Sequence, residues 1–217
     1  MIKAVIFDLD NTLYDYDLCN AAAEAALYRE ISDQLKISCE TAGAVVKKAK
    51  INVKKNLGAE VAASHNRLLY MQNVCEQLGK DPLKYAMRFY NAYWDVMLME
   101  MKLFDYVIPF INTLQGRGMQ TGILTDLTAH IQYRKMEALG LTGYVDCLVT
   151  SEEAGAEKPS DKIFHLMLKK LKVLPKEALM IGDSQFRDIE GAVSVGMQAV
   201  RFEKGMDVYE RTSALLG

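Results

Sequence analysis

The distribution of apolar residues divides this chain of 217 residues into two kinds of segment. Short apolar runs rich in β-branched residues alternate with helical periods in residues 1–14 and 102–217. Between them, in residues 15–101, apolar side chains recur only at helical spacing, as at Leu27 and Ile31. These patterns predict an α/β core made of residues 1–14 plus 102–217, into which residues 15–101 are inserted as an all-helical domain.

The alternating segments predict a Rossmann-like, doubly wound parallel sheet, because strand–helix–strand crossovers connect parallel strands with one hand. The expected strands are 4–7, 121–124, 145–149, 178–181 and 198–202. The expected helices of the core are 109–115, 129–139, 160–171 and 186–195. Because the insertion follows the first strand directly, we expect it to act as a cap over the carboxyl ends of the strands, where open α/β sheets bind ligands.

Composition and charge exclude several classes of protein. Half of the residues are hydrophobic and the formal net charge is −2, as in ordinary globular domains, so neither a nucleic acid polymer nor a membrane is expected as a partner. The four cysteines are scattered without a Cys-x-x-Cys pair, and no segment has the pattern of a signal peptide. We therefore expect a cytoplasmic protein with reduced thiols. The three histidines lack the spacing of zinc ligands.

Polar residues that could take part in catalysis or ligand binding follow the ends of the expected strands. In chain order they are Asp8, Asp10, Thr125, Asp126, Lys158, Asp183, Ser184 and Asp188. Because the carboxyl ends of parallel strands share one edge of a sheet, we expect these side chains to lie together.

The predicted edge holds four carboxylates at positions 8, 10, 183 and 188 with one lysine, Lys158. Several carboxylates cannot all ionise side by side without more positive charge than one lysine supplies. Mg²⁺, which takes carboxylate, water and phosphate oxygens, would supply it. The Thr125 hydroxyl and the Lys158 ammonium would suit a phosphoryl group. Taken singly, Thr125-Asp126 favours a helix N-cap and Lys158 a solvated loop lysine, but their joint occurrence at successive strand ends favours a site.

Together these residues resemble the motifs of the haloacid dehalogenase-like (HAD) hydrolase superfamily, in the branch with a helical cap inserted after the first motif. The first motif, DxDxT, matches residues 8–12, and the second, a Thr or Ser at a strand end, matches Thr125. The third matches Lys158-Pro159, and the fourth, GDSxxxD, matches residues 182–188. The resemblance covers essentially the whole alternating part of the chain and implies a Mg²⁺-dependent phosphatase, that is, a phosphoric monoester hydrolase.

The resemblance also implies a role for each matched residue. Asp8 would be the nucleophile that forms an aspartyl-phosphate, and Asp10 would protonate the leaving group and later activate water. Asp8, the backbone carbonyl of Asp10 and Asp183 would bind Mg²⁺, with Asp188 and Ser184 supporting these ligands from behind.

The remaining matched residues would hold the phosphoryl group: Thr125, Lys158 and Asp126. Members of this branch often carry Asn where Asp126 stands, so its extra carboxylate either faces the phosphate or is turned away, leaving only its backbone N–H for binding. Arg187 also stands where Asn is common, and we expect it to pair with Asp188 or with Asp126.

A phosphatase acting on a small phosphorylated metabolite is the leading interpretation. The sequence around the first and third motifs is similar to nucleotidase-like members, which favours a nucleoside monophosphate. A phosphomutase on the same core and a non-catalytic module that binds phosphorylated metabolites are the alternatives, although such modules usually lose a catalytic residue and none is lost here. A dehalogenase is disfavoured, because those members lack the second aspartate of the first motif, here Asp10.

Overall fold

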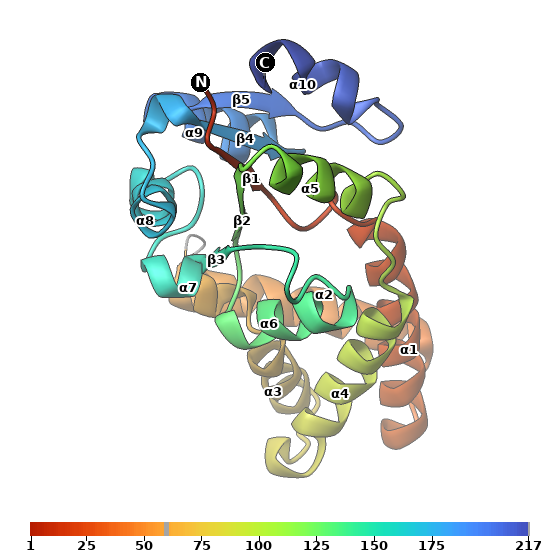
Figure 1. The fold of residues 1–217 in the computed structure, drawn as a ribbon. Helices are drawn as coiled ribbons and strands as arrows, with labels where there is room; N and C mark the ends of the chain where they lie inside the picture. The colour runs from red at the N-terminus through yellow and green to blue at the C-terminus, as the bar shows by residue number, and fades with distance from the viewer. Residues whose placement is uncertain (59–60, 217) are drawn as a thin grey trace. The chain divides into compact units, whose positions relative to one another are not determined.

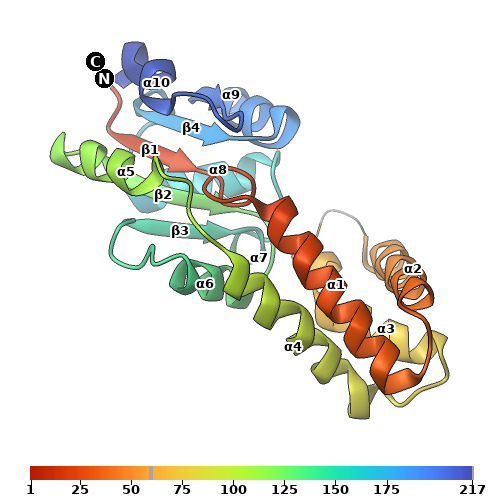
Figure 2. The same cartoon turned by 90° about the vertical axis from the view of Figure 1, so that its right-hand side faces the viewer.

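The computed structural model describes residues 1–58 and 61–216. The chain forms two compact units, which Figures 1 and 2 show as ribbons. The first, called the core below, comprises Met1–Asp15 and Lys102–Gly217, and the second, called the helical unit, comprises Tyr16–Met101.

The core contains a parallel sheet of five strands. They are β1 (Ala4–Phe7), β2 (Gln120–Thr125), β3 (Cys147–Thr150), β4 (Ala178–Gly182) and β5 (Gln198–Arg201). Their order in the sheet is β3-β2-β1-β4-β5. The chain therefore steps outward from β1 to β2 and β3, crosses back past β1 to β4, and steps outward on the other side to β5. The α/β, doubly wound fold class expected from the sequence is confirmed.

Helices cover both faces of this sheet (Figure 1). They are α5 (Val107–Gly116), α6 (Ala129–Ala138), α7 (Ser151–Ala154), α8 (Asp161–Leu171), η2 (Pro175–Glu177), the π-helix η3 (Gln185–Glu190), α9 (Gly191–Ser194) and α10 (Val208–Leu216). On one face, Ile6 of β1 packs in a buried cluster with Phe164 of α8. On the other, the rings of Phe7 and Phe110 of α5 meet edge to face, with centroids 6.0 Å apart. Because β1 is covered on both faces, its sequence is apolar without interruption.

The helical unit contains α1 (Tyr16–Leu35), α2 (Cys39–Leu57), the short η1 (Ala62–His65), α3 (Arg67–Gln77) and α4 (Pro82–Glu100). Ser38 caps α2 and Asp81 caps α4, because each side chain accepts a backbone N–H of the first turn. The buried stripe of α1 repeats every four residues and includes Ala23, Leu27 and Ile31. Within residues 1–58 and 61–216, no helix is both long and apolar enough to cross a bilayer.

The main departure from the expected elements lies after β4. A single helix was expected over residues 186–195, but the chain forms the π-helix η3 and then the short α9. The Ser184 hydroxyl accepts a hydrogen bond from the Arg187 N–H, and the Asp188 carboxylate accepts one from the Ser184 N–H. The Ser184 carbonyl accepts the Ile189 N–H at 3.3 Å as well as the Asp188 N–H at 3.0 Å, so the turn includes a backbone bond over five residues. π-helical turns of this kind are frequent at functional sites. The helices α7 and α10 were not expected.

Candidate active site

Asp8 lies immediately after β1, in the middle of the sheet. Its backbone N–H donates to the carbonyl of Ile181 on β4 at 2.9 Å, which continues the strand pairing one residue beyond β1. The side chain is buried. The carboxylate is therefore held by a rigid backbone at the point where β1 and its neighbours end side by side.

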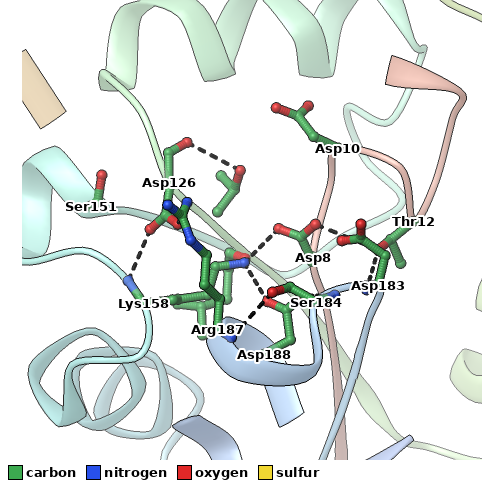
Figure 3. Close-up of polar contacts among 12 residues, drawn as sticks. Asp8, Asp10, Thr12, Asp126, Ser151, Lys158, Asp183, Ser184, Arg187 and Asp188 are labelled. Carbon is green, nitrogen blue, oxygen red and sulfur yellow. Dashed lines mark hydrogen bonds and ion pairs between the residues drawn. The ribbon is translucent and has the colours of Figure 1, made fainter. Parts of the chain in front are cut away.

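Lys158 reaches Asp8 from the loop that follows α7. Its ammonium donates to Oδ1 of Asp8 and to Oδ1 of Asp188, both at 2.6 Å, and to the Leu124 carbonyl at 3.1 Å (Figure 3). These three bonds match the three donors of an ammonium group. Burial opposes the charge of this group, but the two carboxylates outweigh burial and raise the pKa of Lys158. Lys158 is therefore a fixed cation at the centre of the site.

Three carboxylates at this point form a group that could hold a metal ion. Oxygens of Asp8, Asp183 and Asp188 lie within 4.8 Å of one another. Burial, reinforced by Asp188 and Asp10, raises the pKa of Asp8 well above its usual range despite Lys158, and burial together with Asp188 raises the pKa of Asp183. When ionised, the three carboxylates and Lys158 leave a formal charge of −2, which a divalent cation neutralises. The donor set therefore fits Mg²⁺, a hard ion that prefers carboxylate oxygens.

Asp188 reaches this group because of a glycine at the end of β4. A Cβ on Gly182 would lie 2.4 Å from Cγ of Asp188, far inside van der Waals contact. The second oxygen of the Asp188 carboxylate accepts the Ser184 N–H at 2.9 Å. Asp188 is thus fixed by Lys158, by Ser184 and by the open space above Gly182.

Asp10 has different surroundings from Asp8, although only one residue separates them. Lys135 of α6 donates to both carboxylate oxygens of Asp10, at 2.7 and 2.8 Å, and the Tyr14 hydroxyl donates to Oδ1 at 2.5 Å. Figure 3 shows the Asp10 side chain pointing away from Asp8. The carboxylate of Asp10 therefore does not join the group of Asp8, Asp183 and Asp188, although the sequence placed four carboxylates together.

Two threonines complete the edge of the sheet. Thr12 donates weakly to Oδ2 of Asp8 at 3.4 Å and accepts the Asp183 N–H at 3.1 Å, which ties the loop after β1 to the loop after β4. The Thr125 hydroxyl accepts a hydrogen bond at 2.8 Å from the buried amide of Gln132, which also donates to the Asp126 carbonyl. Gln132 thereby fixes the conformation of the loop that follows β2.

The carboxylate of Asp126 is turned toward the backbone of the neighbouring loop. Its Oδ1 accepts the Lys158 N–H at 3.0 Å, and its Oδ2 pairs with Arg187 at 3.2 Å. Burial raises the pKa of Asp126, although Lys158 and Arg187 act in the opposite direction. Of the two partners considered for Arg187, the structure shows Asp126. Asp126 and Arg187, the two residues at which Asn is common in the family, are therefore bonded to each other.

Sequence reasoning missed two buried polar residues of this site, Gln132 and Lys135. Both lie on the buried face of α6, beside Ile131 and Met136. A glutamine and a lysine at inward positions of a helix are costly unless bonded, and this helix directly follows the loop of Thr125. That combination is the signal in the sequence that points to a polar site beside α6.

The fold and the site together place a buried aspartate, a lysine and a candidate metal-binding group of carboxylates at the topological switch point of a doubly wound parallel sheet. A family model described as haloacid dehalogenase-like hydrolase matches residues 2–196. The chain belongs to this family, and the expected family is confirmed.

Curated relatives narrow the class of enzyme. A ribulose-1,5-bisphosphate 5-phosphatase from Halopiger xanaduensis is 40% identical over 94% of this chain and 85% of its own length. A glyceraldehyde 3-phosphate phosphatase from Methanopyrus kandleri is 32% identical over the same shares. The crystal structure of a HAD phosphatase from Thermococcus onnurineus superposes with a TM-score of 0.71 at 27% identity, covering 97% of this chain and 91% of that one. The expected enzyme class, a HAD-type phosphatase, is confirmed by these comparisons.

Proposed function

We propose that this protein is a Mg²⁺-dependent phosphatase of small sugar phosphates that works through an aspartyl-phosphate on Asp8. The observation that carries the proposal is the contrast between two neighbouring aspartates. Asp8 is buried, rigid and bonded to Lys158, whereas Asp10 is held apart from it by Lys135 and Tyr14. Such different environments suit two different tasks in one reaction.

In the first step, a carboxylate oxygen of Asp8 attacks phosphorus, and the bond from phosphorus to the leaving oxygen breaks. Asp10 gives that oxygen a proton, so the product leaves as an alcohol. In the second step, Asp10 takes a proton from water, the water oxygen attacks phosphorus, and the bond to Asp8 breaks to release phosphate. In both steps the Thr125 hydroxyl would bind a phosphoryl oxygen, and the fixed positive charge of Lys158 would stabilise the phosphoryl group.

The metal would be held by the carboxylates of Asp8 and Asp183, with Asp188 close enough to contribute, and the backbone carbonyl of Asp10 remains the ligand implied by the family resemblance. A bound Mg²⁺ would neutralise charge on the phosphoryl oxygens. Lys158 binds both Asp8 and Asp188 and keeps their carboxylates in place.

A sugar phosphate is proposed rather than a nucleoside monophosphate. The relatives named above act, by their names, on ribulose 1,5-bisphosphate and glyceraldehyde 3-phosphate. They give the nucleotide expectation no support. We further propose that residues 15–101, the inserted helical part, act as the cap that selects among substrates.

The experiment is a screen for phosphate release from a panel of sugar phosphates, triose phosphates and nucleoside monophosphates, with Mg²⁺ and with excess EDTA. We expect release from sugar or triose phosphates that requires Mg²⁺. Conversion of a substrate to a phosphorylated isomer without phosphate release would instead identify a phosphomutase, and binding without turnover a non-catalytic module. Full activity in EDTA would contradict the metal assignment.

A further inference from the structure

The helical unit contains a cavity of its own, with a volume of about 230 Å³. This is roughly eight times the ~30 Å³ that one water molecule occupies in the liquid, so the cavity can hold a small ionic group. Its walls come from α1, α2, α3 and α4. The charged residues that line it are Glu24, Lys47, Lys50 and Arg67.

Arg67 is a cation that has aromatic neighbours in place of a carboxylate. Its guanidinium carbon lies 4.4 Å from the ring centroid of Tyr93 and 4.9 Å from that of Trp94. One Nη2 proton is donated to the Tyr16 hydroxyl at 2.7 Å. Within residues 1–58 and 61–216, no other hydrogen bond and no ion pair is made by this guanidinium. Four of its five N–H donors are therefore available to a ligand.

The aromatic cluster fixes the position of Arg67. The Tyr16 and Tyr93 hydroxyls both donate to Oδ1 of Asn20, at 3.3 and 2.6 Å, so α1, α3 and α4 are joined around the guanidinium. Trp94 is buried, and its indole N–H has no acceptor in the described part of the chain. The cluster thus holds more donors than acceptors, in a fixed arrangement.

The charges around the cavity also favour an anion. Lys47 and Lys50 are exposed residues of α2 at its wall, and with Arg67 they outnumber the single carboxylate of Glu24 by three to one. Glu24 lies close to the Tyr28 hydroxyl, and burial together with Glu24 raises the pKa of Tyr28 to about 12. Arg67 is also the first residue of α3, where the helix dipole adds positive potential. The aromatic rings and the Tyr16 hydroxyl stabilise the guanidinium, and an anion in the cavity would pair with the positive charge that remains.

We propose that this cavity binds a phosphate monoester group, with the Arg67 guanidinium as its main ligand. A planar guanidinium with free N–H donors matches phosphate oxygens in pairs. The phosphate group that occupies the cavity could come from two sources. One is a second phosphate on the substrate, which deepens the proposed function and rests on it, and the other is a separate phosphorylated effector.

Trp94 provides a direct measurement of binding, since it is the single tryptophan of the chain and its ring lies against Arg67. Titration of the full-length protein with inorganic phosphate should produce a saturable change in tryptophan fluorescence. The Arg67→Met variant should lose affinity by about tenfold or more, because a charge-assisted bond is removed. The Arg67→Lys variant keeps the positive charge but loses the planar set of N–H donors, so its affinity for phosphate should lie between those of the parent protein and Arg67→Met.

Arg88→Met is the matched control. Arg88 lies on α4 and pairs with Glu30 at the surface, so the same substitution there should leave the titration unchanged. Far-UV circular dichroism of each variant establishes that the helices are retained. No saturable response in the parent protein, or equal affinities in the parent and in a folded Arg67 variant, would overturn the proposal. This readout does not require any phosphatase activity, so it stands even where the proposed function fails.

Kinetics then separate the two sources. When the second phosphate of a substrate occupies the site, Arg67→Met should lower kcat/KM for ribulose 1,5-bisphosphate about tenfold or more and leave an aryl phosphate within about twofold. Unchanged kcat/KM for every substrate, with the fluorescence response intact in the parent, would assign the site to a separate effector. An equal loss for the aryl phosphate, which has no second phosphate, would contradict the substrate assignment.

Discussion

The ammonium of Lys135 is bonded to both carboxylate oxygens of Asp10, at 2.7 and 2.8 Å, across 125 residues of sequence. The Lys135 side chain is fully buried, while that of Asp10 is 26% exposed, so one side of the Asp10 carboxylate remains open. A buried lysine opposite the proposed general acid fixes the direction in which that acid points. Lys135 is therefore a positioning residue in our account.

Replacing Lys135 by Met should lower kcat by roughly tenfold to a hundredfold, which is part of the ~10²–10⁴-fold that a general acid contributes. The loss should be larger for a sugar phosphate, whose alkoxide needs a proton on leaving, than for an activated aryl phosphate. KM should change little, because the contact is not with substrate. Steady-state kinetics on both substrates measure this.

Lys162→Met is a suitable control for Lys135→Met, since Lys162 is an exposed lysine of the core helix α8. It should leave both rates unchanged. Equal losses for the two substrates in Lys135→Met would show that Lys135 supports the fold and does not direct proton transfer.

Asp126 should matter through its bond to the Lys158 N–H more than through its charge. Asp126→Asn keeps an oxygen acceptor, whereas Asp126→Ala leaves that N–H without one, at a cost of about 1–3 kcal/mol. Urea unfolding should therefore show a much larger loss of unfolding free energy for Ala than for Asn. In a double-mutant cycle, the half-exposed pair with Arg187 should couple by less than about 1 kcal/mol. Losses of equal size in Asn and Ala would contradict this.

Gly182→Ala should weaken Mg²⁺ binding. Its Cβ would displace Asp188, which lies 2.4 Å away at Cγ and is held by Lys158 and Ser184. Disturbing a group that supports metal ligands typically costs about 10–100-fold in affinity. The Mg²⁺ concentration for half-maximal activity should rise accordingly, while Gly116→Ala, which has open space around its Cβ, should not change it. An unchanged Mg²⁺ requirement would show that Asp188 has no part in the site.

The stabilisation of the fold by Mg²⁺ should depend on pH through Asp8 and Asp183, because the pKa values of both carboxyl groups are raised in the fold. A raised carboxyl pKa means that the folded state holds a proton at a pH where the unfolded chain has lost it. The metal-free fold therefore gains stability as pH falls through the raised pKa toward the ordinary value of about 4. Mg²⁺ competes with these protons.

The rise in Tm produced by Mg²⁺ should consequently be largest near neutral pH and shrink on acidification. Differential scanning fluorimetry with Mg²⁺ and with EDTA, across a pH series, measures it. Asp183→Asn should show a smaller rise at every pH. A rise that does not depend on pH would mean that these carboxyl groups are not the ligands.

Much of the fold could be predicted because most of its strands are buried on both faces, so they are largely apolar, and polar residues follow directly where they end. β1 shows this most clearly, since Ala4–Phe7 is uninterrupted and Asp8 follows directly. The positions of Asp8, Lys158 and Asp188 followed from the rule that parallel strand ends share one edge. The contact that could not be predicted is Lys135 with Asp10, because it depends on the rotation of α6 about its axis rather than on a strand end.

The π-helix after β4 also escaped prediction, for a local reason. Apolar spacing over residues 186–195 is helical, but it cannot distinguish an α-helix from a wider turn. The wider turn is defined by the backbone bond from the Ile189 N–H to the Ser184 carbonyl, five residues back, which apolar spacing does not record. Similarly, the direction of the Asp126 carboxylate depends on the Lys158 backbone, which lies 32 residues away in sequence.

In the proposed mechanism, Asp8 carries the phosphoryl group while Asp10 transfers protons. Intact-protein mass spectrometry after rapid acid quench, with an activated aryl phosphate as substrate, tests it most directly. We expect a phosphate adduct on Asp8 in the parent protein, none in Asp8→Asn, and an adduct that still forms in Asp10→Asn because this leaving group needs little protonation. An adduct that persists in Asp8→Asn, or that maps to any other residue in the parent protein, would contradict the account.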